Sequence, residues 1–391
     1  MPDAVIVSAC RTAIGTSFRG TLTETEPAVL ARAVLDESLK RTGLGAGEID
    51  DFILGEVGGG GGDVARFVAV EAGLTELPGL AQNRHCASGL SAVQTAAASI
   101  MCGMDRAIIA GGVQSISTAP QLRRRVLGTA DEMVDWTPPT HPNRADAPNN
   151  DMSITVGWNT AQAIGATREE LDAWALRSHE RAIAAIDEGR FKDEIVPLTV
   201  TTRDGSTVVF DTDEHPRRGS TMEKLASLKP LHPEIEGFSI TAANSSGIND
   251  AAALTVVMAD EFAAEKGLAP LARVLSWVSI GVDPAETGMA PTKAIPKALS
   301  RAGLGLDDVE LFEVNEAFAS VPLAVERVLG VSDEKINISG SGCSLGHPVA
   351  ATGARMIATL IYDLKRRGGG IGVAAMCAGG GMGSALVLEI L

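Results

Sequence analysis

The sequence predicts an α/β fold made of two similar halves with a longer segment inserted between them. Three observations lead to this prediction. A pattern near position 40 recurs near position 300, short apolar runs alternate with helical patterns in both halves, and the stretch 116–246 differs in composition from its flanks. Short, wholly apolar strands separated by helices are typical of a sheet covered on both faces.

The repeat begins with a pair of glycines. Gly43 and Gly45 recur as Gly303 and Gly305, 260 positions later. Each pair follows an amphipathic stretch and precedes an acidic turn and a short apolar run, which is the pattern of a helix that a glycine ends before a strand. We therefore expect the same helix, turn and strand in both halves.

Two further matches extend the repeat. Residues 86–89 (Cys-Ala-Ser-Gly) match 350–353 (Ala-Ala-Thr-Gly) at a spacing of 264, and residues 108–112 match 376–380 at a spacing of 268. Drifts of four residues are what loop insertions produce between copies of one unit. A duplicated α/β unit is therefore the predicted architecture.

The strands and the inserted segment follow from local pattern. Apolar, β-rich runs predict strands, among them 4–7, 107–110, 254–258 and 371–375. The inserted segment holds a Pro-rich stretch and a helix over 168–188 with one apolar face, so we expect an ordered loop domain and not a linker. The predicted division is 1–115 with 247–268 for the first half, 116–246 for the insertion and 269–391 for the second half.

The charge and cysteine content exclude several classes of function. The 391-residue chain has 33 basic and 49 acidic side chains, a net charge of −16, which disfavours nucleic acid and anionic membranes as partners. No apolar run is long enough to span a membrane. The five cysteines are odd in number and widely separated, with no metal-like pair, which predicts free thiols, a cytoplasmic location and no metal site.

Cys86 is the first residue that could carry chemistry. Small residues follow it and open a predicted helix, so its sulfur would lie near a helix N-terminus, where backbone N–H groups favour a thiolate. The alternative reading of Cys86 alone is a buried structural cysteine.

His347 lies in a glycine-flanked turn before another predicted helix. So many small neighbours leave an imidazole little to pack against, which favours a role as the general base that takes a proton from a nearby thiol. The other five histidines lie on segments that we expect to be polar or exposed: His85, His141, His179, His215 and His232.

Two more candidates follow predicted strands. Cys377 begins a Cys-Ala-Gly-Gly-Gly turn, in which Gly379 and its neighbours would let a ligand approach the backbone and use its N–H groups as an oxyanion hole. Asn315 ends the predicted strand 309–314, where an exposed amide could orient a water or a carbonyl. Ligands usually bind at the carboxyl ends of such strands.

These segments, in this order and spacing, resemble the thiolase family of acyl-CoA acyltransferases, and the resemblance covers nearly the whole chain. It is carried by Asn83–Gly89, Asn315–Phe318, Gly346–Pro348 and Cys377–Gly383, with supporting matches at 8–12, 176–179, 241–247 and 281–284. The family fold is a five-layered αβαβα sandwich of two similar halves with a loop domain. The resemblance implies this fold for the present chain.

The resemblance also implies a reaction, the reversible Claisen condensation in which 3-oxoacyl-CoA and CoA give a shortened acyl-CoA and acetyl-CoA. Cys86 would be the acylated nucleophile, His347 its base and Cys377 the second acid and base. Asn315, through a water, would stabilise the thioester or ketone oxygen, and the N–H groups of Cys86 and Gly379 the acyl-enzyme oxygen. CoA would be a co-substrate, with no prosthetic group required.

The resemblance further implies where CoA would bind. Arg217 and Ser246 match CoA-contacting positions, and three apolar positions would line the pantetheine route: Met152, Ala317 and Phe318. A basic cluster within the acidic whole would hold the phosphates: His215, Arg217, Arg218 and Lys224. A solvated charged loop is the alternative reading of that cluster. CoA thioesters are thus the expected partners. The resemblance also implies a role in lipid metabolism or β-oxidation and a chain that assembles as a homodimer or homotetramer.

Several positions depart from the common family pattern, and they leave substrate preference and assembly open: Asp151, Gly157, Trp158, Ser341, Gly342, Ala350 and the loop 136–150. Two other functions compete. A ketoacyl-synthase-like condensing enzyme usually pairs its cysteine with two histidines, whereas Cys377 stands in place of the second one here. A catalytically silent acyl-CoA-binding relative would be expected to have lost one of the four residues Cys86, His347, Cys377 and Asn315.

Overall fold

The computed structural model of the chain describes residues 2–59 and 62–391. The first half and the strand that completes it comprise β1 (Ala4–Thr12), β2 (Gly15–Thr16), α1 (Pro27–Thr42), η1 (Ala46–Glu48), β3 (Asp51–Glu56), α2 (Val64–Glu71), β4 (Leu80–Gln82), α3 (Ser88–Met101), β5 (Ala107–Gln114), β11 (Asn249–Ala259) and α7 (Asp260–Lys266). The second half comprises β12 (Ala272–Gly281), η3 (Pro284–Met289), α8 (Ala290–Arg301), η4 (Leu306–Asp308), β13 (Val309–Val314), α9 (Ser320–Leu329), η5 (Asp333–Lys335), α10 (Gly342–Leu345), α11 (Thr352–Arg366), β14 (Gly370–Ala378) and β15 (Met382–Ile390).

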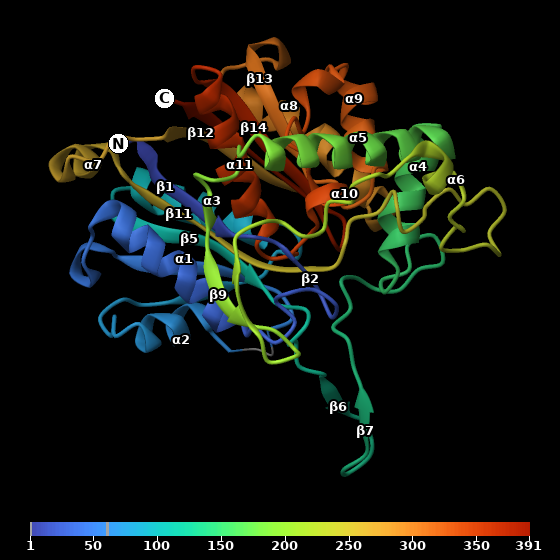
Figure 1. Cartoon of the computed structure of the whole chain (residues 1–391), viewed down its shortest axis with the longest axis horizontal. Coiled ribbons are helices and arrows are strands. Elements are labelled where there is room, and N and C mark those ends of the chain that lie inside the picture. Colours follow the sequence, from blue (N-terminus) through green and yellow to red (C-terminus); the bar gives the residue numbers. More distant parts are fainter. Residues whose placement is uncertain (1, 60–61) are drawn as a thin grey trace.

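The segment between the halves is less regular. Its elements are β6 (Arg123–Arg125), β7 (Met133–Asp135), η2 (Ser153–Trp158), α4 (Asn159–Ala163), α5 (Arg168–Asp187), β8 (Ile195–Val196), β9 (Leu198–Thr201), β10 (Thr207–Phe210) and α6 (Met222–Ala226). Strands β6 and β7 form an exposed hairpin that projects from the body of the molecule (Figure 1). None of the described helices has the length and apolarity that crossing a membrane requires.

The main sheet forms one continuous path in the order β13-β14-β15-β12-β1-β11-β5-β3-β4, with β2 and β8 paired beside it. The two halves of this path meet only where β1 and β12 pair, at Val5 with Arg273 and Ile6 with Ala272. In each half, two antiparallel pairings are followed by a parallel one, such as β3 with β5 and β13 with β14. The halves therefore repeat one sheet design.

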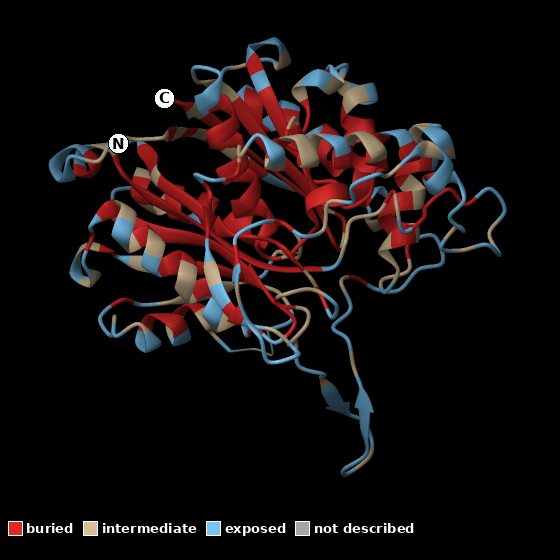
Figure 2. Cartoon of the chain, in the orientation of Figure 1, coloured by how far each residue is buried: buried red, intermediate tan, exposed pale blue. Residues whose placement is uncertain are grey.

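Helices on three levels complete the predicted sandwich. Helices α1 and α2 cover the outer face of the first half-sheet, and α8 covers that of the second with α9 beside it. Helices α3 and α11 pack against each other and contact strands of both half-sheets, so they form a central layer (Figure 1). Burial follows this arrangement, because the strands and the central helices are the most buried parts of the chain (Figure 2). The αβαβα fold expected from the sequence is thus confirmed.

Two glycines allow the central helices to touch. A Cβ atom on Gly89 would lie 2.6 Å from the carbonyl oxygen of Ala350, and one on Gly353 would lie 2.2 Å from the backbone nitrogen of Leu90. Both distances are too short for any side chain. Gly89 and Gly353 occupy equivalent positions in the two halves. In each half this glycine therefore lets the backbone of the other half's central helix approach closely.

The repeated helix ends also match the prediction. Gly43 and Gly303 have φ values of 68° and 72°, in the left-handed region that glycine favours. The acidic turns that follow are closed in the same way in both copies, because the Gly45 and Gly305 N–H groups donate to the carboxylates of Glu48 and Asp308.

The inserted segment is fixed to the first half by a buried ion-pair cluster. Arg11 on β1 donates from Nε to Glu194, at 2.7 Å, and from both terminal nitrogens to Asp213, at 2.7 and 2.8 Å. All three side chains are buried, and Ile14 adds its N–H to Asp213. A guanidinium that binds one carboxylate with two parallel hydrogen bonds defines its partner's orientation.

Candidate active site

Cys86 lies in a tight turn just before α3. His85, the preceding residue, has a φ of 46°, which is uncommon for a residue with a side chain and reverses the chain direction sharply. The hydroxyl of Ser88 holds the turn, because it donates to the His85 carbonyl at 2.7 Å and accepts the Arg84 N–H at 2.8 Å. The sulfur is therefore presented by a rigid turn at the end of a central helix.

The surroundings of Cys86 act on its thiol in opposite directions. Burial raises the pKa of Cys86, whereas hydrogen bonds from the backbone N–H groups of Gly379 and of Cys86 itself lower it. The net effect is a raised pKa, so the group is a thiol at neutral pH. A nucleophile in this state needs a base to remove its proton.

Cys377 lies beside Cys86. It is buried on β14, and its pKa is raised first by burial and then by the neighbouring Cys86 thiol. The turn after it needs glycine, because Gly380 has a φ of 84° and a Cβ there would lie 2.7 Å from the carbonyl oxygen of Thr140. The structure thus brings together Cys86, Cys377 and Gly379, which the sequence places almost 300 residues apart.

His347 is buried in the turn between α10 and α11. Its Nδ1 lies 2.7 Å from the hydroxyl of Thr352, and that hydroxyl donates its single proton to the carbonyl oxygen of Pro348 at 3.0 Å. The hydroxyl must then accept from His347, which puts the imidazole proton on Nδ1. Burial, followed by the positive charge of Arg355, lowers the pKa of His347 to about 3, so the ring is neutral and its lone pair lies on Nε2.

Asn315 faces that lone pair. Its Nδ2 donates a long hydrogen bond, of 3.4 Å, to Nε2 of His347, and its Oδ1 has no hydrogen-bond partner among the described residues. The expectation of an exposed amide is wrong, because Asn315 is fully buried at the end of β13. A buried carbonyl oxygen without a partner can accept a hydrogen bond from a water or ligand that enters the site.

The next residue, Glu316, fixes Asn315 in place. Its carboxylate accepts hydrogen bonds from four donors on three segments: Trp174, Ser178, Asn337 and the backbone N–H of Cys343. Two of these donors lie on α5, so the inserted segment helps to position the catalytic candidates of the second half. Short-range sequence pattern did not indicate this role for Glu316.

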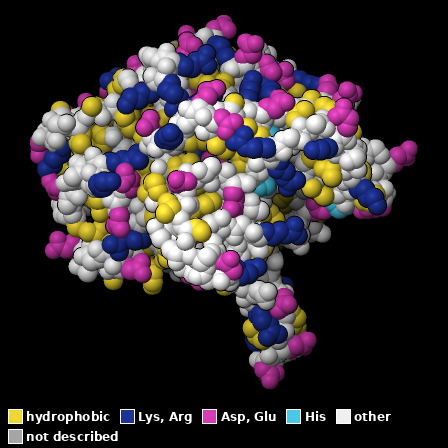
Figure 3. Space-filling model, in the orientation of Figure 1, with side chains coloured by type: hydrophobic (Ala, Val, Ile, Leu, Met, Phe, Trp, Pro, Cys, Tyr) yellow, Lys and Arg dark blue, Asp and Glu magenta, His cyan; other side chains and the backbone are white. Residues whose placement is uncertain are grey.

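The predicted basic cluster lines one cavity. Arg217, Arg218, His215 and Lys224 all contribute to a hollow of about 270 Å³ between α5, α6 and the segment around Ala243. On the face shown in Figure 3, acidic and basic side chains are interspersed, with His side chains next to Lys and Arg on its right half. The basic character is thus local, as the sequence predicts.

The segment 241–248 connects this cavity with the catalytic candidates. Ala242 and Ala243 line the cavity, the Ser246 N–H donates to the carbonyl of Ala317, and Ile248 forms a bridge with His347. The apolar candidates Met152, Ala317 and Phe318 pack in one cluster with the second half. Ser246 lies along this path, half-buried, but does not itself line the cavity.

Two histidines are more buried than the sequence suggested. His141 accepts the Thr140 hydroxyl and donates to the carbonyl of Ala147, and His179 lies on the buried face of α5. The segments of these two residues are expected to be polar or exposed, and the expected exposure is wrong, because both side chains are buried. The helical period contained the signal for His179, since it follows Ala175 by four positions and precedes Ala182 by three, and both alanines belong to the predicted apolar face.

Three of the departures from the family pattern have local explanations. A Cβ at Gly157 would lie 2.8 Å from the ring of Phe318, so no larger residue fits there. Asp151 pairs with His232 at 2.7 Å. Ser341 accepts a hydrogen bond from Arg355 at 3.0 Å. None of these three contacts removes a candidate catalytic group.

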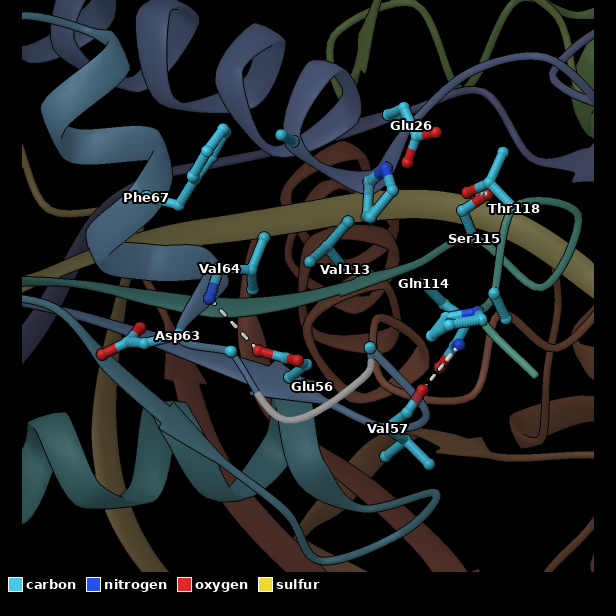
Figure 4. A pocket seen from close by; sticks show the side chains of 16 residues that line it. Glu26, Glu56, Val57, Asp63, Val64, Phe67, Val113, Gln114, Ser115 and Thr118 are labelled. Atoms are coloured by element: carbon cyan, nitrogen blue, oxygen red, sulfur yellow. Dashed lines mark hydrogen bonds between the residues drawn. The ribbon is translucent and has the colours of Figure 1, made fainter. Parts of the chain in front are cut away.

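A second and larger cavity, about 550 Å³, contains none of the predicted site residues (Figure 4). Phe67, Val64 and Val113 supply apolar walls, but Glu26, Glu56 and Asp63 add three carboxylates. Such a lining repels phosphate groups. Within residues 2–59 and 62–391, no group of three or more His, Cys, Asp or Glu side chains is arranged to hold a metal ion.

Comparisons with known proteins agree with this geometry. Family models described as "Thiolase, N-terminal domain" and "Thiolase, C-terminal domain" match residues 4–261 and 268–390. Curated proteins named acetyl-CoA acetyltransferase from Syntrophomonas wolfei and Pseudomonas aeruginosa are 44% and 43% identical, each over at least 99% of both chains.

A solved structure agrees as well. The crystal structure of the Bacillus anthracis acetyl-CoA acetyltransferase superimposes with a TM-score of 0.88 at 39% identity, covering 100% of this chain and 99% of that one. These matches do not favour a ketoacyl synthase or a silent binding protein. The chain belongs to the thiolase family and is an acyltransferase.

Proposed function

We propose that the chain carries out the thiolase reaction, 3-oxoacyl-CoA plus CoA to a shortened acyl-CoA plus acetyl-CoA and its reverse, through an acyl group on Cys86. The observation that carries this proposal is the meeting of the Cys86 sulfur with the Gly379 N–H and the Cys377 thiol in one buried place. A nucleophile, an oxyanion donor and a second acid are together there.

In the first half-reaction, His347 Nε2 takes the proton of the Cys86 thiol. Its neutral tautomer, with the proton on Nδ1, leaves Nε2 able to accept. The Cys86 sulfur then bonds to the C3 carbonyl carbon of 3-oxoacyl-CoA, and the C2–C3 bond breaks. The electron pair of that bond stays on C2, which takes a proton from the Cys377 thiol, so acetyl-CoA leaves and an acyl thioester remains on Cys86.

In the second half-reaction, the Cys377 thiolate takes the proton of an incoming CoA thiol. The CoA sulfur bonds to the acyl carbon, the bond from Cys86 breaks, and the Cys86 sulfur recovers its proton from His347. The backbone N–H groups of Cys86 and Gly379 would stabilise the oxygen of the acyl group, and Asn315 with a water would stabilise the thioester oxygen. The unpartnered Oδ1 of Asn315 supports this assignment.

We propose that CoA is the co-substrate and lies with its nucleotide at the basic cavity. Arg217 there is exposed, and among the described residues its guanidinium has no hydrogen-bond partner, which leaves it available to a phosphate. The 241–248 segment, with Ser246, would guide the pantetheine arm toward His347, and Met152, Ala317 and Phe318 would border it. The carboxylates of the larger cavity make that cavity a poor alternative.

The test is intact-mass measurement after mixing with acetoacetyl-CoA. We expect an added acetyl group on the wild-type chain, located on Cys86 by peptide mapping, and none on Cys86→Ser. The Cys10→Ser variant is a matched control, because Cys10 is buried on β1 away from the site. An acetyl group on another cysteine, or thiolysis by Cys86→Ser at the wild-type rate, would contradict the proposal.

We also propose a metabolic role, a location, an oligomeric state and a domain division for the enzyme. A role in lipid metabolism such as β-oxidation follows from the proposed substrates, and a cytoplasmic location is supported by the five free cysteines. A homodimer or homotetramer is supported by exposed apolar side chains on α2, on the edge strand β4 and on the β6–β7 hairpin, among them Phe67, Leu80 and Leu127. We propose the division 1–115 with 247–268, 116–246 and 269–391 because β11 pairs with β1 and β5.

A further inference from the structure

The basic cavity holds a histidine whose chemical state the surrounding backbone fixes. His179 projects from α5 into this cavity, where its ring lies near that of His215, with the centroids 6.5 Å apart. The side chain is buried within the protein but lines the space that Arg217 and Lys224 also border. Any role of His179 in substrate binding rests on the proposed function, in which CoA enters this cavity.

The tautomer of His179 follows from one hydrogen bond. The backbone N–H of Arg217 donates to Nδ1 of His179 at 3.2 Å. A backbone N–H can only donate, so Nδ1 carries a lone pair and no proton. Burial, with the nearby His215 and Arg217, lowers the pKa of His179 to about 4. At neutral pH the ring is therefore uncharged and has its proton on Nε2.

That Nε2–H group has no partner in the part of the chain that the structure describes. The hydrogen bond from Arg217 is the one contact of this kind that the His179 ring makes there. A polar N–H that lines a cavity without a partner is available to an acceptor atom of a ligand. The backbone contact at Nδ1 also fixes the ring plane, so the direction of the donor is set before a ligand arrives.

The charges around the cavity indicate which acceptor fits. Arg218 is engaged by Asp187 through two hydrogen bonds, and Lys224 donates to the carbonyl of Gly219. Arg217, next to His179, is the cation whose guanidinium has no such engagement among the described residues. The guanidinium of Arg217, free among the described residues, and the neutral Nε2–H donor of His179 lie side by side. Together they bind an anionic oxygen of a ligand better than an uncharged acceptor.

We infer that His179 is a CoA-binding residue whose Nε2–H donates to a phosphate oxygen of the CoA nucleotide, alongside Arg217. The two sources of such an oxygen in CoA are the 3′-phosphate and the 5′-diphosphate. The residue selects for the nucleotide part of the substrate and has no part in the bond-making steps at Cys86.

The experiment separates nucleotide binding from acylation. Acetoacetyl-pantetheine, which has no nucleotide, supplies the acyl group to Cys86, and CoA or 3′-dephospho-CoA accepts it. We compare wild type, His179→Ala, His179→Gln and Glu180→Ala, the last being a neighbour on the exposed face of α5. The measurements are acylation by intact mass, kcat, and KM for each acceptor.

We expect His179→Ala to acylate like wild type and keep kcat, with KM for CoA raised about tenfold, the effect of one hydrogen bond to a charged acceptor. His179→Gln should lose less, because its amide can donate, and Glu180→Ala should match wild type. If the 3′-phosphate is the acceptor, wild type and His179→Ala have the same KM for 3′-dephospho-CoA. If the diphosphate is the acceptor, the substitution raises both KM values alike.

Two results would overturn the inference. One is a KM for CoA in His179→Ala within twofold of wild type, with acylation intact. The other is loss of acylation from acetoacetyl-pantetheine in both His179 variants, which would mean that the side chain supports the fold. Failure of the wild-type chain to acylate at all would instead count against the proposed function.

Discussion

Replacing Thr352 by Val tests the tautomer assigned to His347. Thr352 is fully buried at the start of α11, and its hydroxyl lies 2.7 Å from Nδ1 of His347. Valine has nearly the same shape but puts a methyl group against the Nδ1–H, which then has no partner. A buried donor without a partner costs about 1–3 kcal/mol.

That cost shifts the imidazole toward its other tautomer. With the proton on Nε2, the nitrogen that faces Asn315 can no longer accept the Cys86 proton. If the whole cost appears in the reactive state, kcat/KM falls roughly 5- to 150-fold. The second hydrogen bond of Thr352, to Pro348, is lost as well, so the midpoint of thermal unfolding should also fall.

The assay is thiolysis of acetoacetyl-CoA, followed across pH, with unfolding measured in parallel. Thr352→Ser keeps the hydroxyl and is the control, expected within a few-fold of wild type. A Thr352→Val enzyme with wild-type kcat/KM and a folded state at the assay temperature would refute the reasoning, because the base would then not depend on this hydroxyl.

Three more predictions concern stability, each measured by denaturant unfolding. Burial lowers the pKa of His347 to about 3 from an ordinary value of 6.5, so between these values the unfolded chain binds more protons. The free energy of unfolding should then fall by up to about 1.4 kcal/mol per pH unit below pH 6.5 and lose this dependence in His347→Asn. Gly353→Ala forces a Cβ to 2.2 Å from the Leu90 nitrogen and should cost about 1–3 kcal/mol, whereas Gly47→Ala, at an open position, should cost little. Arg11→Met leaves two buried carboxylates unpaired and should cost about 3–5 kcal/mol; a loss under 1 kcal/mol would contradict the anchoring role.

The local features of the fold could be predicted from sequence because they depend on residues close in the chain. Gly43 and Gly303 end helices through their own backbone angles, and the acidic turns after them are closed within four residues. Because the same local pattern occurs in both halves, it also predicts that the two halves share one fold. The repeat also links Ser88 with Thr352, whose hydroxyls each donate to a carbonyl three or four residues earlier.

The burial of polar groups could not be predicted in the same way. Asn315 is enclosed by segments from three regions of the chain, and the partners of Glu316 lie on α5 and around Asn337 and Cys343. Nothing near Asn315 in the sequence indicates these contacts. His179 is a different case. Its spacing along α5 predicts a buried position on the apolar face, whereas its polar side chain suggests exposure, and the spacing was the correct indication.

The position of β11 has a consequence for how the chain folds during synthesis. This strand pairs on one side with β1 and on the other with β5, at the middle of the first half-sheet. It emerges only after the inserted segment, more than 130 residues after β5 ends. Until then β1 has only the short pairing with β8 available, and the strand edge of β5 stays open to pairing with another chain. The insertion thus delays closure of the first core, and a nascent chain paused before residue 259 is the state most exposed to aggregation.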